Sequence, residues 1–224
     1  MNLEELKSLQ RSAAAEHGSY AAALMVCAGT ACVAGKALPL IEQLRKELKS
    51  RGLDKKYLVV PTGCNGFCAQ GPVMVVQPGG IFYQKLTTDH IPEIIEKHLE
   101  GGEPVESLLY HIHGRPVPKM DDIPFFGKQK LLALRHRGML NPESIEDYIR
   151  VGGYQGIHRV LTEMTPGQVT AVVLRSGLRG RGGGGFPAGV KWQSCVAASE
   201  KSGRNRWSYA MPTRVIPEPS WTVP

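Results

Sequence analysis

The sequence predicts an α/β protein in two parts, and three observations support this prediction. In the first part, short runs of valine, isoleucine and aromatic residues alternate with longer stretches of helical periodicity. Residues 110–140, with proline, glycine and mixed charge, then indicate a linker. Beyond the linker, further helical stretches run into an unbroken series of glycines, Gly182–Gly185. A chain of 224 residues is long enough for two ordinary domains, so we expect one on each side of the linker.

The first part, residues 1–109, is expected to alternate helices with strands. Helices are predicted over residues 3–16 and 34–51, the second closed by Gly52, and in the segment that Thr88 caps. Strands are predicted over residues 22–26, 57–60, 73–76 and 81–86, with the turn sequence QPGG between the last two. This order of elements describes a compact α/β sandwich of thioredoxin type.

The second part, residues 141–206, is expected to begin with helices. Pro142 opens a helical stretch that Gly152 closes, and Thr165 followed by Pro166 opens another. The glycine-rich segment SGLRGRGGGGFPAGVKW follows directly. We predict a loop there, ahead of a helix that starts near Gly189.

The composition indicates a globular protein outside membranes. Lys and Arg number 27 against 20 Asp and Glu, a net charge of +7, but the charges of both signs are interspersed without stacking aromatic residues. We therefore expect solvated helix faces and no nucleic-acid partner. No apolar run is long enough to cross a bilayer, and the N-terminus does not resemble a signal peptide. These features predict a cytoplasmic protein without direct membrane insertion.

The cysteines carry the strongest chemical signal. Cys27 and Cys32 follow the first predicted strand, and Cys64 and Cys68 follow the second, in loops rich in glycine. Thiolates on such neighbouring loops can converge on one small inorganic core. Four soft ligands without histidine favour an iron–sulfur cluster or zinc. Zinc usually has two residues between paired ligands, so zinc is the second hypothesis, and cysteines that merely pack are the third.

The glycine loop is a candidate phosphate-binding site. Its backbone N–H groups can turn toward an anion, and the following helix adds its positive N-terminal end. Arg181 and Lys191 can supply charge, and Phe186 an aromatic surface. A glycine run alone is also typical of a flexible linker. The glycines expected to contact the anion are Gly180, Gly182, Gly183, Gly184 and Gly185.

Three other conspicuous residues are expected to have no chemical role. Cys195 follows Lys191 by four residues in the last predicted helix and is expected in the core. The histidines of the linker, His111 and His113, have no recognisable partners in the sequence. No role is assigned to them.

Two segments resemble one family. The cysteine spacing within this order of strands and helices resembles the thioredoxin-like [2Fe–2S] ferredoxin domain of the electron-input module of complex I, soluble hydrogenases and formate dehydrogenases. GRGGGGFPAGVKW resembles the nucleotide loop of the flavin subunit of that module, with Ala188 where threonine is usual. The ferredoxin domain ahead of the flavin domain resembles the flavin subunits of NAD(P)-linked iron-only hydrogenases. The resemblance covers residues 20 to about 206.

The resemblance implies cofactors and partners. It implies a [2Fe–2S] cluster on the four cysteines, and FMN and NAD(P)H at the glycine loop of a Rossmann-like domain. It also implies a [4Fe–4S] cluster in a C-terminal region of the family, whose ligands this chain lacks. Partners would be other subunits of an NADH-dehydrogenase or hydrogenase complex, including a second [2Fe–2S] subunit.

The last residues depart from the family. The family continues with a stretch close to NADEGDPGAFMDR, whereas residues 207–224 read WSYAMPTRVIPEPSWTVP. When the third base of each codon is joined to the first two of the next, codons can be chosen that spell VICNADEGDPGAFMDRS. We therefore expect a frameshift between Arg206 and Ser208, in the gene or in its sequencing.

The expected function follows from this departure. We expect the electron-input subunit of an NAD(P)H-dependent oxidoreductase complex, with an incomplete FMN/NADH domain that does not oxidise NADH in this chain. The alternative is a stand-alone [2Fe–2S] electron-transfer or remnant protein without catalysis.

Overall fold

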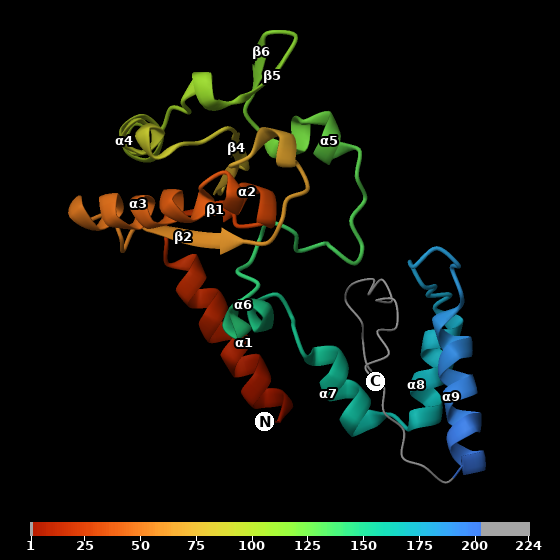
Figure 1. Ribbon diagram of the computed structural model, residues 1–224. Coiled ribbons are helices and arrows are strands. Elements are labelled where there is room, and N and C mark those ends of the chain that lie inside the picture. Colours follow the sequence, from red (N-terminus) through yellow and green to blue (C-terminus); the bar gives the residue numbers. More distant parts are fainter. Residues whose placement is uncertain (1, 203–224) are drawn as a thin grey trace, which may run out of the picture. The chain divides into compact units, whose positions relative to one another are not determined.

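The computed structural model describes residues 2–202 in two compact units, Met1–Gln155 and Gly156–Pro224 (Figure 1). Each unit is described by itself. The predicted frameshifted tail, residues 207–224, lies outside the described residues. Within the part that the structure describes, no helix is long and apolar enough to cross a membrane.

A mixed four-stranded sheet organises the first unit. Its strands are β1 (Ala22–Cys27), β2 (Tyr57–Thr62), β3 (Met74–Gln77) and β4 (Ile81–Tyr83), in the order β2-β1-β3-β4. β1 runs parallel to β2 and antiparallel to β3, and β3 and β4 form a hairpin. The predicted strands are confirmed, and the fold is the expected α/β fold.

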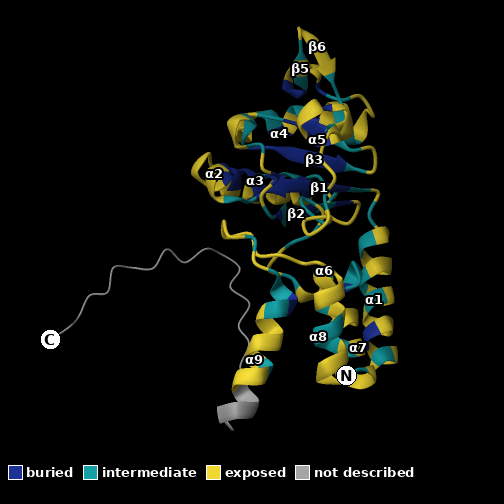
Figure 2. Ribbon diagram, turned by 90° about the vertical axis from the view of Figure 1, so that its right-hand side faces the viewer, coloured by how far each residue is buried: buried dark blue, intermediate teal, exposed yellow. Residues whose placement is uncertain are grey.

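Alternation along β1 divides the core between the two faces of the sheet. Leu24 and Val26 belong to a cluster with α3 (Ala37–Ser50), whereas Met25 and Cys27 belong to a second cluster on the other face. β1 and β3 are accordingly buried in Figure 2. Because β1 is covered on both faces, its sequence AALMVC is continuously apolar.

Short helical segments complete this part of the chain. The predicted helix over 34–51 corresponds to α3, and the short α2 (Thr30–Ala34) precedes it. The two are separated at Lys36, which adopts a left-handed conformation with φ 70°. After β4, the 3₁₀ turn η2 (Thr88–His90), α4 (Ile91–Glu93) and the π-helical η3 (Ile94–Glu100) form one continuous helical stretch. Thr87, rather than the predicted Thr88, caps it.

Residues 110–127 are more ordered than a simple linker. After η4 (Glu106–Leu108), β5 (Tyr110–Ile112) and β6 (Arg115–Val117) form a hairpin, followed by η5 (Met120–Asp122) and α5 (Pro124–Gly127). Ile123 and Phe126 are buried in the second cluster. This segment therefore covers one face of the sheet.

Two helices at opposite ends of the first unit pack together. α1 (Leu3–Gly18) begins at a capping box formed by Asn2 and Glu5, and α6 (Ile145–Arg150) lies beside it. Leu6 of α1 and Ile149 of α6 are buried, and the Gln10 amide donates to the Arg150 carbonyl oxygen at 3.3 Å. Residues 144–155 thus belong to the first unit, and the domain boundaries at 109 and 140 stay predictions.

The second unit contains α7 (Gln155–Glu163), α8 (Pro166–Arg175) and α9 (Ala188–Ser202). Thr165 opens α8 in a capping box with Gln168, as the sequence predicts. α8 packs on α9 at Gly189, where an added Cβ would lie 2.4 Å from the Cα of Leu174. Among residues 156–198, no hydrophobic side chain is buried, and the buried position is this glycine.

Candidate metal centre

The topology places both cysteine pairs at one edge of the sheet. Cys27 ends β1, and Cys32 lies in α2 directly after it. Cys64 and Cys68 follow β2, which is parallel to β1 in a register that pairs Cys27 with Thr62. Since parallel neighbours end at the same edge, the two loops leave the sheet side by side.

The two loops are in direct contact at glycines. A Cβ added to Gly29 would lie 2.8 Å from the Cβ of Cys64, and one added to Gly71 would lie 2.9 Å from the Sγ of Cys32. Neither position tolerates a side chain without movement of a cysteine. The glycines therefore let the two cysteine loops approach each other closely.

The site is half buried and half open. Cys27 and Cys32 are buried, at 2% and 3% exposure, whereas Cys64 and Cys68 are exposed. The backbone N–H of Gly66 donates to the Sγ of Cys64 at 3.2 Å. A group held here would be anchored in the core on one side and accessible from solvent on the other.

The thiols influence one another across the two loops. Burial, together with the neighbouring thiols of Cys27 and Cys68, raises the pKa of Cys32 to about 12. The charge of Cys64 raises the pKa of Cys68, followed by burial and by Cys27. Four thiolates at this edge would repel one another, and bound metal cations would offset that repulsion. The donor set therefore fits a soft, positively charged metal centre.

The thiols form two pairs rather than one tight group. Among the described residues, no three Cys, His, Asp or Glu side chains are gathered around a point that one metal ion would occupy. Cys27 interacts with Cys32, and Cys64 with Cys68. In a two-iron cluster with four cysteine ligands, each iron takes two of them, which is the arrangement that two pairs supply.

Aromatic residues support the second cysteine loop, and the sequence analysis did not identify them. Phe67, which precedes Cys68, stacks on Phe125 with ring centroids 4.6 Å apart and meets Phe126 edge-on at 5.3 Å. Phe82 and Tyr110 also contact the Phe67 ring. The adjacent phenylalanines in the predicted linker were the available signal, because an apolar pair is unusual in an exposed linker.

The glycine loop is closed at its base in the second unit. The Gly180 N–H donates to the Phe186 carbonyl oxygen at 2.9 Å, and Arg179 pairs with Pro187 in a β-bridge. Of the predicted nucleotide residues, residues 180–186 thus lie in one loop ahead of α9, and Lys191 lies within α9.

The tip of the loop does not enclose a site by itself. Four of the predicted residues are exposed there: Arg181, Gly182, Gly183 and Gly184. A Cβ added to any of these three glycines would have no atom within 4 Å, so close packing does not require glycine there. The backbone requires it at Gly183 and Gly185, whose φ values are 104° and 55°. The predicted cradle of Gly182, Gly183 and Gly184 around a phosphate is therefore an open turn in this structure.

A side chain of the loop lies beside a side chain of α9. The Lys191 ammonium is 6.0 Å from the centroid of the Phe186 ring, which is half exposed. Arg179, which the sequence analysis did not single out, donates from Nε to the Gly185 carbonyl oxygen. The Phe186 ring and the Lys191 ammonium therefore lie together beside the loop, while the Arg179 side chain is bonded to the loop backbone.

The structure also places the three remaining conspicuous residues. The prediction for Cys195 is wrong, because this thiol is exposed on α9 rather than part of a core. His111 lies in β5, and His113 lies at the β5–β6 turn with φ 49°.

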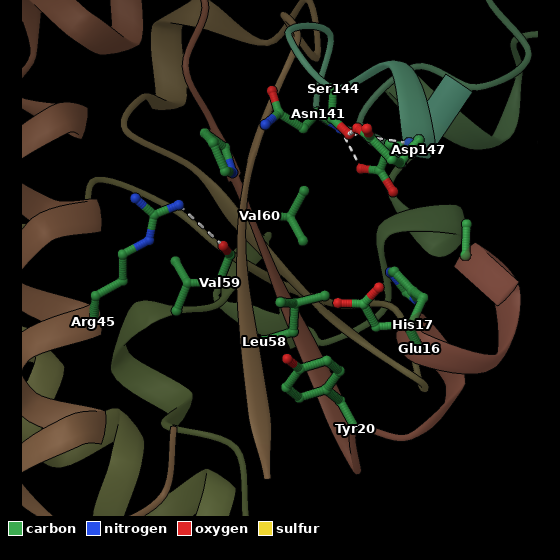
Figure 3. Close-up of a pocket in the computed structure, with 13 residues that line it drawn as sticks. Glu16, His17, Tyr20, Arg45, Leu58, Val59, Val60, Asn141, Ser144 and Asp147 are labelled. Atoms are coloured by element: carbon green, nitrogen blue, oxygen red, sulfur yellow. Dashed lines mark hydrogen bonds between the residues drawn. The ribbon is translucent and has the colours of Figure 1, made fainter. Parts of the chain in front are cut away.

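A separate pocket of about 380 Å³ lies in the first unit (Figure 3). Its walls come from α1, α3, β2 and the residues around the start of α6, including Glu16, His17, Arg45 and Asp147. Figure 3 shows Arg45 extended toward the Val59 carbonyl oxygen, to which it donates at 3.4 Å. Burial lowers the pKa of His17, Arg150 lowers it further, and Asp147 raises it. None of the predicted site residues lines this pocket.

Comparisons with known proteins match the part of the chain that contains the four cysteines. The thioredoxin-like [2Fe–2S] ferredoxin family matches residues 15–99, which contain all four cysteines of the site. A 2Fe-2S ferredoxin of Clostridium pasteurianum is 42% identical over 77 residues, which are 34% of this chain and 76% of that protein.

Subunits of larger enzymes are similar over shorter parts of their length. The NADP-reducing hydrogenase subunit HndC of Solidesulfovibrio fructosivorans is 58% identical over 65 residues, 29% of this chain and 13% of that subunit. An NADH-quinone oxidoreductase subunit of Aquifex aeolicus is 47% identical over 53 residues, 24% of this chain and 12% of that subunit. The matched segments thus span a small fraction of these two subunits.

Proposed function

The chain belongs to the thioredoxin-like [2Fe–2S] ferredoxin family, and from this premise we propose that Cys27, Cys32, Cys64 and Cys68 hold the [2Fe–2S] cluster. The observation that supports this assignment is the contact between the two cysteine loops at the shared edge of β1 and β2. Such a cluster accepts and donates single electrons.

In the proposed site, the buried and the exposed cysteines have different roles. Cys27 and Cys32 anchor the group in the core, because both side chains are buried against the sheet. Cys64 and Cys68 lie at the surface, where an electron partner can approach. Phe67 and its aromatic neighbours hold the outer loop in place. The protein therefore acts as a one-electron relay.

The cluster assignment predicts the metal content of the purified chain. We expect about two iron atoms and two inorganic sulfides per chain, and an EPR signal on reduction. The Cys64→Ser variant is expected to lose the cluster, because an outer ligand is removed, whereas Cys195→Ser, at an exposed thiol in the other unit, keeps it. Iron, sulfide and zinc analysis measures this, and stoichiometric zinc without sulfide would contradict the assignment in favour of a zinc site.

We further propose that the chain derives from the electron-input subunit of a cytoplasmic NAD(P)H-dependent complex. The similarity to hydrogenase and NADH-quinone oxidoreductase subunits supports this proposal, as does the glycine loop closed at its base. A second [2Fe–2S] subunit would be a partner, and the cofactor's chemistry would be hydride acceptance by the flavin. The residues that would contact FMN or NAD(P)H are Gly180, Arg181, Gly182, Gly183, Gly184, Gly185, Phe186 and Lys191.

The described part of the second unit favours electron transfer alone, without NADH oxidation, for this chain. Residues 156–198 bury no large hydrophobic side chain, so little apolar burial offsets the ordering of the nucleotide loop. Electron transfer by the ferredoxin unit without NADH oxidation is therefore the second candidate function. It agrees with the long match to a separate ferredoxin.

The two functions are distinguished by one assay. We expect the 224-residue chain to bind no FMN and to show no NADH-dependent ferricyanide reduction, while dithionite still reduces its cluster. A chain with the reading frame restored at codon 207 and continued downstream is expected to gain both FMN and NADH oxidation. Turnover with bound flavin in the 224-residue chain would contradict the narrower function, and a flavin-free, inactive restored chain would contradict the electron-input proposal.

A further inference from the structure

An unpartnered amide lies inside the outer cysteine loop. Asn65 directly follows Cys64, and its side chain is 1% exposed. Neither its Nδ2 nor its Oδ1 has a hydrogen-bond partner among the described residues. Buried amides in proteins are nearly always hydrogen-bonded, so an amide of this kind indicates a partner that is not a protein atom.

The chain beyond the aromatic residues holds this amide in place. A Cβ added to Gly138 would lie 2.1 Å from Oδ1 of Asn65 and 3.2 Å from its Cγ, so the Gly138 backbone packs directly on the amide. The neighbouring Arg137 lies over the same loop, since its Nη1 is 3.7 Å from the Cβ that Gly66 would carry. We call residues 128–139 the cap segment.

Arg137 is itself fixed by the first unit. Its Nη1 donates to Oε1 of Gln129 at 3.0 Å, and its guanidinium lies 5.5 Å from the centroid of the Phe126 ring. Phe126 in turn contacts Phe67 of the cysteine loop. The cap segment is thereby attached at two points to the loop that contains Asn65.

We propose that Asn65 donates an N–H hydrogen bond to sulfur on the Cys64 side of the cluster, and that the cap segment positions it there. This inference rests on the proposed assignment of the four cysteines. Hydrogen bonds to cluster sulfur stabilise the more negative, reduced state and so raise the reduction potential. Asn65 has the required donor, the required position next to a ligand, and no other partner among the described residues.

The first test compares Asn65 with an apolar residue of similar size in the full chain. The Asn65→Leu variant should assemble the cluster with unchanged iron and sulfide content. Its reduction should become about tenfold less favourable, which is a potential about 59 mV lower for a one-electron couple. The small shift of Fe–S stretching bands on transfer to D₂O, measured by resonance Raman spectroscopy, should also decrease.

The second test moves the amide without changing it. Gly138→Ala pushes on Asn65 and should lower the potential in the same direction. Because Gly138 has φ +70°, its control is Gly52→Ala, which has φ +68° and open space around the new Cβ. The Gly52→Ala chain should keep the wild-type potential. If the Asn65→Leu chain assembles no cluster, the potential of Gly138→Ala tests the proposed hydrogen bond instead.

The outcomes separate this inference from the proposed function. The inference would be overturned if a Gly138→Ala or Asn65→Leu chain that contains the cluster showed an unchanged potential and an unchanged D₂O shift. The hydrogen-bond partner of the Asn65 amide would then be an ordered water. Absence of iron and sulfide from the wild-type chain would instead overturn the cluster assignment.

Discussion

Gly29 is the residue at which the two halves of the metal centre meet. Its φ of −67° suits any amino acid, so its backbone conformation does not require glycine. What requires glycine is space, because a Cβ there would lie 2.8 Å from the Cβ and 3.1 Å from the Cα of Cys64. The sequence contains many glycines, and only the fold distinguishes this one as a contact between ligand loops.

Gly29→Ala is therefore expected to separate the cysteine loops. We predict that this variant binds much less iron, on the order of the 10–100-fold loss of affinity typical for damaged metal surroundings. Gly63→Ala is the matched control, because it lies next to Cys64 but has no atom within 4 Å of the new Cβ. Competition with an iron chelator measures the difference. Equal iron retention by the two variants would show that the loops adjust without cost.

At this scale the sequence carries a signal for candidate metal ligands but not for their surroundings. Cysteines at two strand ends are recognisable because strands and soft ligands both have local signals. The burial of Asn65, the exposure of Cys195 and the open tip at Gly183 and Gly184 depend on contacts with distant residues, which have no such signal. The correction for Cys195 follows from this limit.

Tyr83 joins three elements of the first unit through its hydroxyl. The Val105 N–H donates to this hydroxyl at 3.0 Å, so the Tyr83 O–H is free to donate to Nδ1 of His98 in η3, 2.9 Å away. Burial raises the pKa of Tyr83 to about 12 and lowers the pKa of His98 below its ordinary 6.5. Burial thus favours a neutral His98 in this network.

Acidification is expected to destabilise this network. Because the pKa of His98 is lower in the folded chain, the unfolded chain takes up the proton first, and stability falls as the pH drops below about 6.5. Urea unfolding at about pH 7.5 and about pH 5.5, on either side of that value, should show a smaller pH effect in His98→Gln than in the wild type. His17, whose pKa burial also lowers, retains part of the effect. His158→Gln, in α7, is the control, and an equal pH effect in all three chains would contradict the prediction.

Helices and strands with a clear local pattern of apolar or capping residues were predicted closely, and those held by tertiary contacts were not. β1, β3 and α8 follow directly from apolar runs and a capping box. The break at Lys36 has no sequence signal, because lysine rarely adopts a left-handed conformation. The hairpin of β5 and β6 has three-residue strands and polar composition, and its position depends on packing against the sheet edge.

At the scale of the whole molecule, the first compact unit extends to Gln155. α6 follows the predicted linker in the sequence, yet it packs beside α1. Its Ile149 is only 6% exposed, and its Arg150 and Asp147 form an ion pair at 3.0 Å. The N-terminal helix therefore completes a unit that extends to Gln155. Linear sequence could not indicate this, because the contact joins residues separated by nearly the whole unit.

Hydrogen exchange on the full chain tests whether the first unit includes α6. We predict that amides of α1 and α6 are protected together with the sheet, whereas those of α7 exchange quickly, because α7 buries no side chain. Ile149→Ala should cost about 2 kcal/mol and reduce protection in both α1 and α6, since it removes a buried side chain of α6, which packs beside α1. Ile157→Ala, at a side chain 56% exposed in α7, should leave both helices unchanged. Fast exchange in α6 of the wild-type chain, at the rate of α7, would instead place the end of the first unit before residue 145.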